Sequence, residues 1–269
     1  MEKETPAAPA APPFANSYYN WPDLYEATSP GVPGDISFYQ AQATRTGGPV
    51  LEIGSGLGRI SFALARAGLS VVGLEYHSAM LQEAEFRRRS QPQLRGQVQF
   101  IQGDMRNFSL GQQFPLIIMP YRTFLHCLTQ EEQLATLACV REHLLPGGRF
   151  IFDFFLPDHQ LIASEDTSYH LRGRYLHPRT GRPFLLWEAT EVDRLEQRVD
   201  DHLFFELLDE NGQPAQRIYS SFSIRYLFPS ECTLLLRLAG FEVLQVFGGF
   251  HHEPLTEMST DSVWIARRR

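Results

Sequence analysis

Between residues 50 and 155, short apolar runs alternate with longer stretches in which apolar residues recur at helical spacing. The apolar runs predict five buried strands, at residues 50–53, 70–74, 98–102, 114–119 and 149–155. In the helix expected at 131–144, with Thr129 as its N-cap, one face carries Leu134, Leu137, Val140 and Leu144. Strands that alternate with helices predict a parallel sheet, and therefore an α/β fold.

The alternation stops between residues 168 and 226, where no helical spacing is seen. Four extended segments are expected there, at residues 170–177, 184–192, 198–208 and 215–225. Turn residues separate them at Pro178–Gly181 and Asp209–Gly212, and the Asn-Gly pair in the second turn is typical of a hairpin. A last helix at 229–238 and strands at 241–247 and 263–266 return to the first pattern.

This organisation predicts one ligand-binding domain interrupted by a smaller unit. We expect residues 16–160 and 227–269 to form the binding domain. Residues 161–226 would form an antiparallel β insertion that flanks or covers the substrate cleft. Residues 1–15 are rich in Pro and Ala with little to bury, which predicts a disordered tail.

The composition narrows the class of protein. Of 269 residues 43% are hydrophobic, and no apolar run approaches the ~18–20 residues that span a bilayer. The amino terminus lacks the basic start and apolar core of a secretory signal, so we expect a cytoplasmic protein without a membrane partner. The three cysteines are far apart, which favours free thiols over disulfides or a metal site. The net charge of −7 disfavours a nucleic-acid partner, because phosphate binding needs a basic face.

The chemistry of the chain centres on the glycine turn that follows the first strand. Gly54, Gly56 and Gly58 occupy every second position, and the absence of Cβ atoms lets a ligand approach the backbone closely. The next helix presents unpaired N–H groups and a partial positive charge at its start. The turn therefore predicts a nucleotide or nucleoside site at the carboxyl end of a parallel strand.

Three residues around the turn indicate which nucleoside. Arg59 stands where a dinucleotide-binding turn has its third glycine, and Glu52 would repel a pyrophosphate. A carboxylate at that place suits a cationic ligand such as S-adenosylmethionine. Glu75 ends the second strand, 21 residues after Gly54, where an acidic side chain can accept both ribose hydroxyls.

The stretch Glu52–Gly58 resembles the E/D-x-G-x-G-x-G motif of class I S-adenosylmethionine-dependent methyltransferases. The resemblance covers residues 35–155 well and 229–267 in outline. It implies a doubly wound sheet of seven strands, the last antiparallel, with S-adenosylmethionine as methyl donor. It also implies that Asp104 binds the adenine amino group and that the backbone of Met105 contacts the ring. The loop after the fourth strand, which begins at Pro120, would line the methyl-transfer site.

That loop also holds the candidates for catalysis. Tyr121 and His126 can hydrogen-bond to a nucleophile or deprotonate it, and Arg122 can hold a carboxylate or phosphate of the substrate. The loop is not the N/D-P-P-Y/F motif of enzymes that methylate the amino groups of nucleic-acid bases. No catalytic motif is obligatory, because the sulfonium is already a good leaving group and the enzyme chiefly aligns two reactants.

Two further regions supply candidate substrate contacts. An aromatic cluster near the amino terminus either caps the edge of the domain or forms a lid, in which Tyr19 and Tyr25 would contact the substrate. The cluster comprises Phe14, Tyr18, Tyr19, Trp21 and Tyr25. A helix follows at 35–44, with Asp35 as its N-cap. The insertion offers Trp187, Glu188, Tyr219, Phe222, Arg225 and Tyr226, of which we select Trp187 and Arg225.

The sequence thus predicts an enzyme that methylates an N or O nucleophile of a small molecule. A nicotinamide-dependent oxidoreductase is the first alternative, and a non-catalytic S-adenosylmethionine-binding protein is the second. Within the methyltransferase class, a protein or RNA acceptor is also open.

Overall fold

The structure is a computed structural model that describes residues 17–269; the predicted tail at residues 1–15 lies outside the described residues. The larger of two sheets has seven strands in the order β10-β11-β5-β4-β1-β2-β3. Its strands are β1 (Val50–Ile53), β2 (Val71–Glu75), β3 (Val98–Gln102), β4 (Phe114–Met119), β5 (Leu144–Phe155), β10 (Phe241–Phe247) and β11 (Asp261–Arg268). The pairs that β11 forms with β5 and β10 are antiparallel and all other pairs are parallel, which confirms the predicted α/β fold with a doubly wound, mostly parallel sheet.

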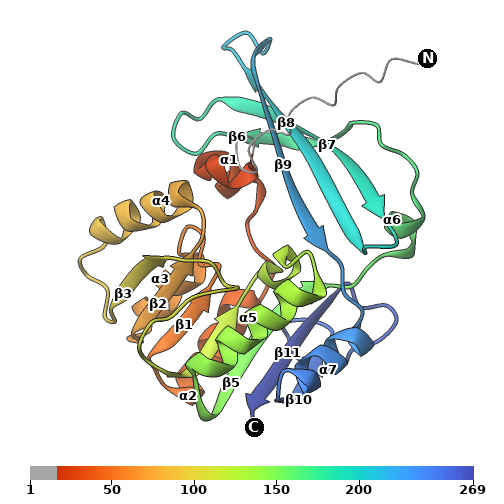
Figure 1. Cartoon of the computed structure of the whole chain (residues 1–269). Helices are drawn as coiled ribbons and strands as arrows, with labels where there is room; N and C mark the ends of the chain where they lie inside the picture. Colours follow the sequence, from red (N-terminus) through yellow and green to blue (C-terminus); the bar gives the residue numbers. More distant parts are fainter. Residues whose placement is uncertain (1–16) are drawn as a thin grey trace, which may run out of the picture.

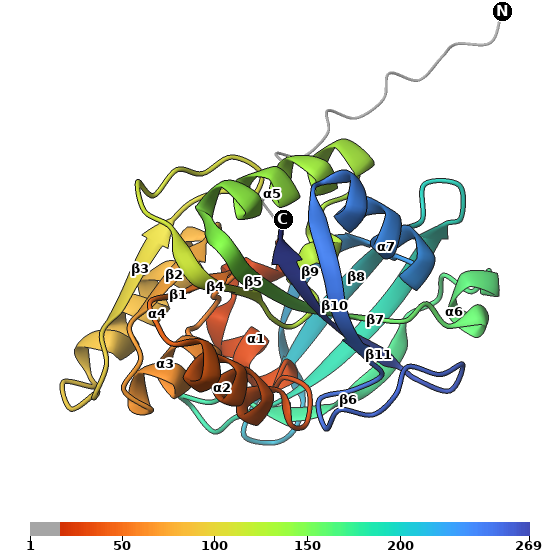
Figure 2. The same ribbon diagram turned by 90° about the horizontal axis from the view of Figure 1, so that it is seen from below.

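Helices cover both faces of this sheet. One face carries α2 (Asp35–Thr46), α3 (Arg59–Arg66) and α4 (Ser78–Arg89), and the other carries α5 (Gln130–His143) and α7 (Pro229–Leu238) (Figure 2). Shorter helices are η1 (Tyr18–Asn20), α1 (Pro22–Thr28), η2 (Thr123–His126) and α6 (His159–Ala163). No helix in residues 17–269 is long and apolar enough to cross a membrane.

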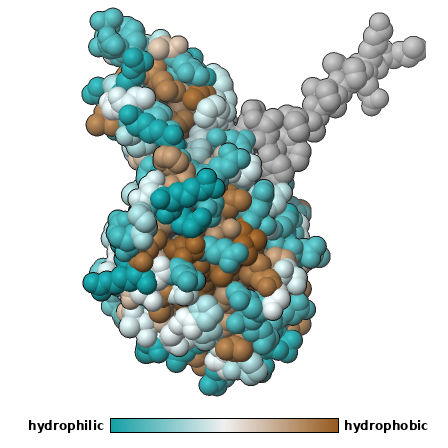
Figure 3. Space-filling model, turned by 90° about the vertical axis from the view of Figure 1, so that its left-hand side faces the viewer, coloured by the Kyte–Doolittle hydropathy of each residue, from teal (hydrophilic) through white to brown (hydrophobic). Residues whose placement is uncertain are grey.

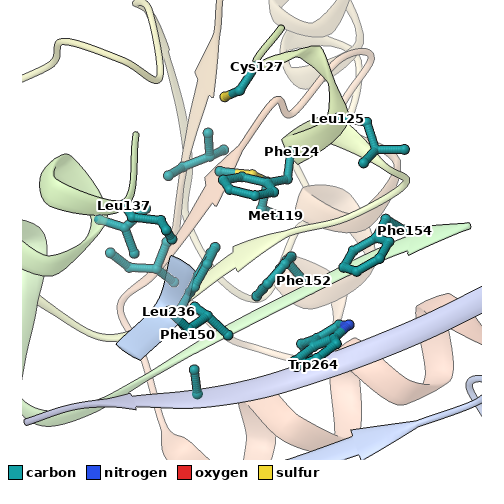
Figure 4. Close-up of a cluster of buried hydrophobic side chains, with 14 of the residues drawn as sticks. Met119, Phe124, Leu125, Cys127, Leu137, Phe150, Phe152, Phe154, Leu236 and Trp264 are labelled. Carbon is teal, nitrogen blue, oxygen red and sulfur yellow. The ribbon is translucent and has the colours of Figure 1, made fainter. Parts of the chain in front are cut away.

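The main core lies between the sheet and helices α5 and α7 (Figure 4). Alternate residues of β5, Phe150, Phe152 and Phe154, point to this side, and Trp264 of the neighbouring β11 lies 5.9 Å from Phe154 between ring centroids. Leu137 of α5 is buried in the same cluster. Burying large aromatic side chains from adjacent strands fixes the register of β5 against β11.

A second sheet forms the upper part of the molecule in Figure 1. It is antiparallel, with the strand order β6-β7-β8-β9. Its strands are β6 (His170–Leu176), β7 (Pro183–Asp193), β8 (Arg198–Leu208) and β9 (Pro214–Arg225). Gly212, in the turn before β9, has a φ of 77°, a conformation that favours glycine. The inner face of this sheet packs on η1 and α1, so the amino-terminal segment lies between the two sheets.

One predicted helix start is wrong. Asp35 was expected as an N-cap, but it is the first residue of α2, and Gly34 occupies the cap position. The Asp35 carboxylate instead forms a two-point ion pair with Arg59, at 2.8 and 2.5 Å. A strong partner in the tertiary structure therefore takes the carboxylate away from the helix end.

Candidate active site

A cavity of about 1930 Å³ lies where the two sheets meet. Its lining comes from the glycine turn, the ends of β2 and β3, the loop after β4, the amino-terminal η1 and the strands of the antiparallel sheet. Figure 3 shows the narrower waist between the larger lower part and the smaller upper part. Small-molecule pockets commonly occupy about 300–1,000 Å³, so this cavity has room for a nucleoside cofactor and an acceptor together.

The glycine turn forms one wall of the cavity. Gly54 and Gly56 line it with φ values of 69° and 54°, and a Cβ on Gly54 would collide with Thr123. A Cβ on Gly56 would meet only Met80, at 3.8 Å, so its absence leaves open space toward the cavity. Gly58 does not line the cavity; a Cβ there would lie 2.7 Å from Phe100. Gly58 therefore serves the packing of the turn.

Glu52, a predicted cofactor contact, lies behind the turn and does not line the cavity. Its carboxylate is buried and accepts a hydrogen bond from Ser61 of α3. Burial raises the pKa of Glu52 to about 7, although Ser61 and Arg59 act in the opposite direction. The structure therefore makes Glu52 a support of the turn rather than a wall of the site.

Glu75 lies at the carboxyl end of β2 and lines the cavity. One carboxylate oxygen accepts a hydrogen bond from the backbone N–H of Gly56, at 2.7 Å. The other accepts from the backbone N–H of His77, at 2.8 Å. Burial raises the pKa of Glu75, and these backbone hydrogen bonds oppose the rise. The side chain is thus held rigidly at the turn, with lone pairs left for hydroxyl donors.

Asp104 and Met105 follow β3 and also line the cavity. Arg106 binds the Asp104 carboxylate at 2.6 Å and lowers its pKa. The same guanidinium contacts Glu132 of α5. Asp104 is therefore an oriented, ionised acceptor at the edge of the sheet, beside the glycine turn and Glu75.

The loop after β4 holds two consecutive residues in the left-handed region, Tyr121 at φ 58° and Arg122 at φ 66°. Asp153, a fully buried residue of β5, accepts hydrogen bonds from both backbone N–H groups, at 2.9 and 3.2 Å. The hydroxyl of Tyr39 donates to the same carboxylate at 2.6 Å. Pro120 does not line the cavity, whereas Tyr121 and Arg122 do. Asp153 therefore holds a strained loop that shapes the site.

Arg122 is engaged within the protein. Its guanidinium binds Asp261 of β11 at 3.1 Å and lies 5.2 Å from the centre of the Phe155 ring. Its Nε is buried and has no hydrogen-bond partner. Arg122 thus lines the cavity with its guanidinium paired to Asp261.

His126 of η2 and Tyr19 of η1 meet in the cavity. The Tyr19 hydroxyl lies 2.8 Å from His126 Nε2, and His126 Nδ1 lies 3.1 Å from the carbonyl oxygen of Ser223 in β9. A carbonyl can only accept, so Nδ1 carries the ring proton and Nε2 accepts from the Tyr19 hydroxyl. Burial lowers the pKa of His126 to about 4, which keeps the ring neutral near pH 7.

Aromatic rings surround this hydrogen-bonded pair. The centroid of the Tyr19 ring is 4.6 Å from that of His77, 5.8 Å from that of Tyr25 and 6.5 Å from that of Phe222. All of these residues line the cavity, including Tyr19 and Tyr25, for which a contact with the substrate stays a prediction. Burial raises the pKa of Tyr19 well above its ordinary value, so the hydroxyl keeps its proton. Tyr18, Tyr19 and Tyr25 therefore form a wall of the site, which favours the predicted lid; Trp21 does not line the cavity, and Phe14 lies outside the described residues.

Two residues that were predicted to contact the substrate do not lie at the candidate site. Trp187 points to the outer face of the antiparallel sheet, where its ring stacks on Phe204 at 5.6 Å. Arg225 is buried and bound to Glu231 at 3.0 Å. Neither lines the cavity, because strand alternation and an internal ion pair turn them away. Of the six candidates in the insertion, only Glu188 and Phe222 line it.

The sequence interpretation missed Asp153 and Asp201. Asp153 interrupts the aromatic run of β5, and a carboxylate in such a run was a visible sign of a special role. Asp201 of β8 shares the inward phase of Val199, Leu203 and Phe205, and it lines the cavity. Period-two alternation could have placed it there.

The residues present fit S-adenosylmethionine. The open cradle at Gly56, the fixed carboxylate of Glu75 and the acceptor Asp104 lie on one side of the cavity, next to the aromatic wall. Across residues 17–269 no three His, Cys, Asp or Glu side chains are grouped so that they could hold a metal ion.

Comparisons with known proteins agree with this arrangement. Residues 50–148 match a family model described as a methyltransferase domain. Cypemycin N-terminal methyltransferase from a Streptomyces species is 28% identical over 241 residues, which cover 90% of this chain and 91% of that protein. The CcbJ methyltransferase from Streptomyces caelestis superposes with a TM-score of 0.77 at 25% identity, over 94% of this chain and 98% of that chain.

The amino pentose methyltransferase CalS10 from Micromonospora echinaspora shares the fold, with a TM-score of 0.65 at 21% identity over 87% of this chain and 89% of that chain. Sheet topology, glycine turn and these similarities define a Rossmann-like methyltransferase. Residues 50–148 thus carry a methyltransferase domain, in a chain that is similar to S-adenosylmethionine-dependent methyltransferases over most of its length. These findings favour a methyltransferase over the oxidoreductase that the sequence had left open.

Proposed function

We propose that this enzyme transfers the methyl group of S-adenosylmethionine to the nitrogen of a small-molecule amine. S-adenosylmethionine, when bound, supplies a methyl group on a leaving group that needs no activation by the protein. In this proposal Gly54, Gly56, Glu75, Asp104 and Met105 hold the cofactor. The chain's remaining task is to orient an acceptor whose lone pair is free.

The hydrogen bond from Tyr19 to His126 carries the proposal. Because the Tyr19 hydroxyl donates its hydrogen bond to His126 Nε2, the lone pairs of the Tyr19 oxygen are available in the cavity. That oxygen can accept a hydrogen bond from the N–H group of an uncharged amine. The bond would orient the amine so that its nitrogen lone pair points to the methyl group. Amines titrate at about 8–10.4, so an uncharged fraction exists near neutral pH. Tyr19 and His126 would therefore position that fraction for attack on the methyl group.

The same pair disfavours a hydroxyl acceptor. An alcohol must lose a proton as it attacks, and a useful general base titrates near the working pH. His126, with a pKa lowered by burial to about 4, is too weak a base for that task. The similarity to cypemycin N-terminal methyltransferase, an enzyme named for a terminal amino group, supports the same choice.

The test is a product assay on matched acceptors. The enzyme would be given S-adenosylmethionine with amino sugars, peptides with a free amino terminus, and the corresponding alcohols. We expect formation of S-adenosylhomocysteine and N-methylated product only with the amines. Methylation of the alcohols at comparable rates would overturn the choice of nitrogen.

Tyr19→Phe tests the role of the hydroxyl within this assay. The variant keeps the ring and loses the oxygen lone pairs that face the acceptor. We expect kcat to fall by about 10–100-fold, which is at the lower end of the effect of a positioned catalytic acid or base, or below it. Affinity for S-adenosylhomocysteine should stay unchanged. Tyr76→Phe changes another tyrosine that lines the cavity, and it serves as the matched control. A full rate in Tyr19→Phe would show that Tyr19 only fills space.

A further inference from the structure

The antiparallel sheet gives the cavity a polar wall that the methyl-transfer step does not use. Where the inner face of this sheet packs on η1 and α1 it is apolar, through Leu186, Leu203, Phe205 and Ile218. Farther along, this sheet adds the polar residues Arg172, Glu188, Thr190 and Asp201 to the lining of the cavity, beside the apolar Val199, Phe222 and Ile224. A change from apolar to charged residues along one face marks a surface that meets something other than protein.

The charges in this wall do not cancel. Arg172 forms an ion pair with Glu188, with its Nε 2.9 Å from the carboxylate. Thr190 donates a hydrogen bond to one oxygen of Asp201 at 2.7 Å. Asp201 is only 9% exposed, and it forms no ion pair with any Arg, Lys or His of residues 17–269. Once Arg172 and Glu188 are paired, one negative charge in the wall has no partner.

An unpaired carboxylate at this depth is costly. Burial, with a further contribution from the neighbouring Glu188, raises the pKa of Asp201 to about 6. The hydrogen bond from Thr190, together with the charges of Arg172 and His202, opposes the rise in pKa but does not offset it. A buried charge is usually kept only where a partner is supplied, and here the free side of the carboxylate faces the cavity. The partner that fits is a cation brought by a ligand.

Sheet register locates Asp201 relative to the methyl-transfer site. Asp201 is directly opposite Phe222 of β9, and the Phe222 ring centroid is 6.3 Å from that of His126. The Asp201 carboxylate shares no hydrogen bond with that pair: it binds Thr190, whereas His126 binds Tyr19 and Ser223, and the Phe222 side chain lies beside His126. A cation held by Asp201 would therefore be a different group from the amine that receives the methyl.

We propose that Asp201 binds a second ammonium group of the acceptor, so that the preferred substrate is a diamine. Thr190 orients the carboxylate, and Arg172 keeps Glu188 from competing for the cation. This proposal rests on the N-methyltransferase function proposed above. It adds the second charge as the feature that sets specificity.

The test compares three series of amines of increasing chain length. Each acceptor has one reactive amino group, and its far end is an ammonium, a hydroxyl or a methyl group. Turnover is followed as S-adenosylhomocysteine release, for wild type, Asp201→Asn and Glu191→Gln. Glu191 lies on β7 outside the cavity lining, so its variant makes the same charge change on the same sheet. Calorimetric titration with S-adenosylhomocysteine checks that each variant is folded.

We expect wild type and Glu191→Gln to prefer diamines of a suitable length by at least tenfold in kcat/KM. Asp201→Asn should lose that preference, mainly through KM, while it keeps its rate on monoamines and its affinity for S-adenosylhomocysteine. Equal use of the three series by wild type, or a preference that persists in Asp201→Asn, would overturn the proposal. If S-adenosylhomocysteine binds and no amine is methylated, the amine-acceptor function itself fails, and the diamine proposal fails with it.

Discussion

Single residues show how the same side-chain type takes different roles in this protein. Glu52 and Glu75 are both buried carboxylates near the glycine turn, but only Glu75 faces the cavity. The sequence predicted that Glu52 lies in the first strand and that Glu75 ends the second. The direction in which Glu52 points was not readable, because it depends on the approach of Ser61 from α3.

The buried Glu52 makes stability depend on pH. Its pKa is raised from 4.5 to about 7, so the folded chain holds this proton more tightly than the unfolded chain does. The free energy of unfolding therefore loses this contribution as pH rises from about 4.5 to about 7. Glu52→Gln keeps an acceptor for Ser61 and has no proton to lose. Relative to wild type it should gain up to about 3 kcal/mol between pH 4.5 and 7.5.

Urea unfolding of wild type and Glu52→Gln at a series of pH values measures that difference. Glu85→Gln, on the surface of α4 and paired with Arg88, is the control and should follow wild type throughout. A difference between Glu52→Gln and wild type that is constant with pH would show that folding does not raise the pKa of Glu52.

At the scale of elements, the sequence predicted the strands and helices of the larger sheet well. Their apolar periodicity is strong, and the structure places β1, β2, β3 and β4 within a residue of the expected ranges. Contacts that the insertion would make were harder to predict. Trp187 and Arg225 were chosen by residue type, whereas the phase of strand β7 and the partner Glu231 decide where they lie.

The loop after β4 depends on an element that is distant in sequence. Asp153 of β5 accepts three hydrogen bonds, two of them from the left-handed residues Tyr121 and Arg122. An asparagine at this position offers one acceptor oxygen and one amide nitrogen that cannot accept. Asp153→Asn should therefore leave a buried donor unpaired and lower the free energy of unfolding by about 1–3 kcal/mol.

The same variant should weaken catalysis, because Tyr121 and Arg122 line the cavity. Urea unfolding measures the effect on stability, and kcat/KM with an amine that the wild type methylates measures the effect on catalysis. Glu242→Gln, which breaks an exposed pair with Arg267, should change stability by less than about 0.5 kcal/mol. Wild-type stability and activity in Asp153→Asn would show that the loop holds its shape without the carboxylate.

At the scale of the whole molecule, the active site lies between parts of the chain that are distant in sequence. Local sequence patterns do not predict that these parts meet. Tyr19, His126 and Ser223 come from three separate regions and meet only after the two sheets and the amino-terminal segment have packed. The sequence named two of these residues as candidates. Their hydrogen bond depends on long-range packing, which the hydrophobic periodicity of the sequence does not predict.

Cofactor binding is the claim on which the account depends, and calorimetric titration with S-adenosylhomocysteine tests it most directly. Glu75→Ala removes the carboxylate expected to bind the ribose hydroxyls, and Glu85→Ala is the control on α4. We predict micromolar binding to wild type and the control, at least tenfold weaker binding to Glu75→Ala, and no heat with NAD. Absence of binding to wild type, or heat with NAD in its place, would contradict the account.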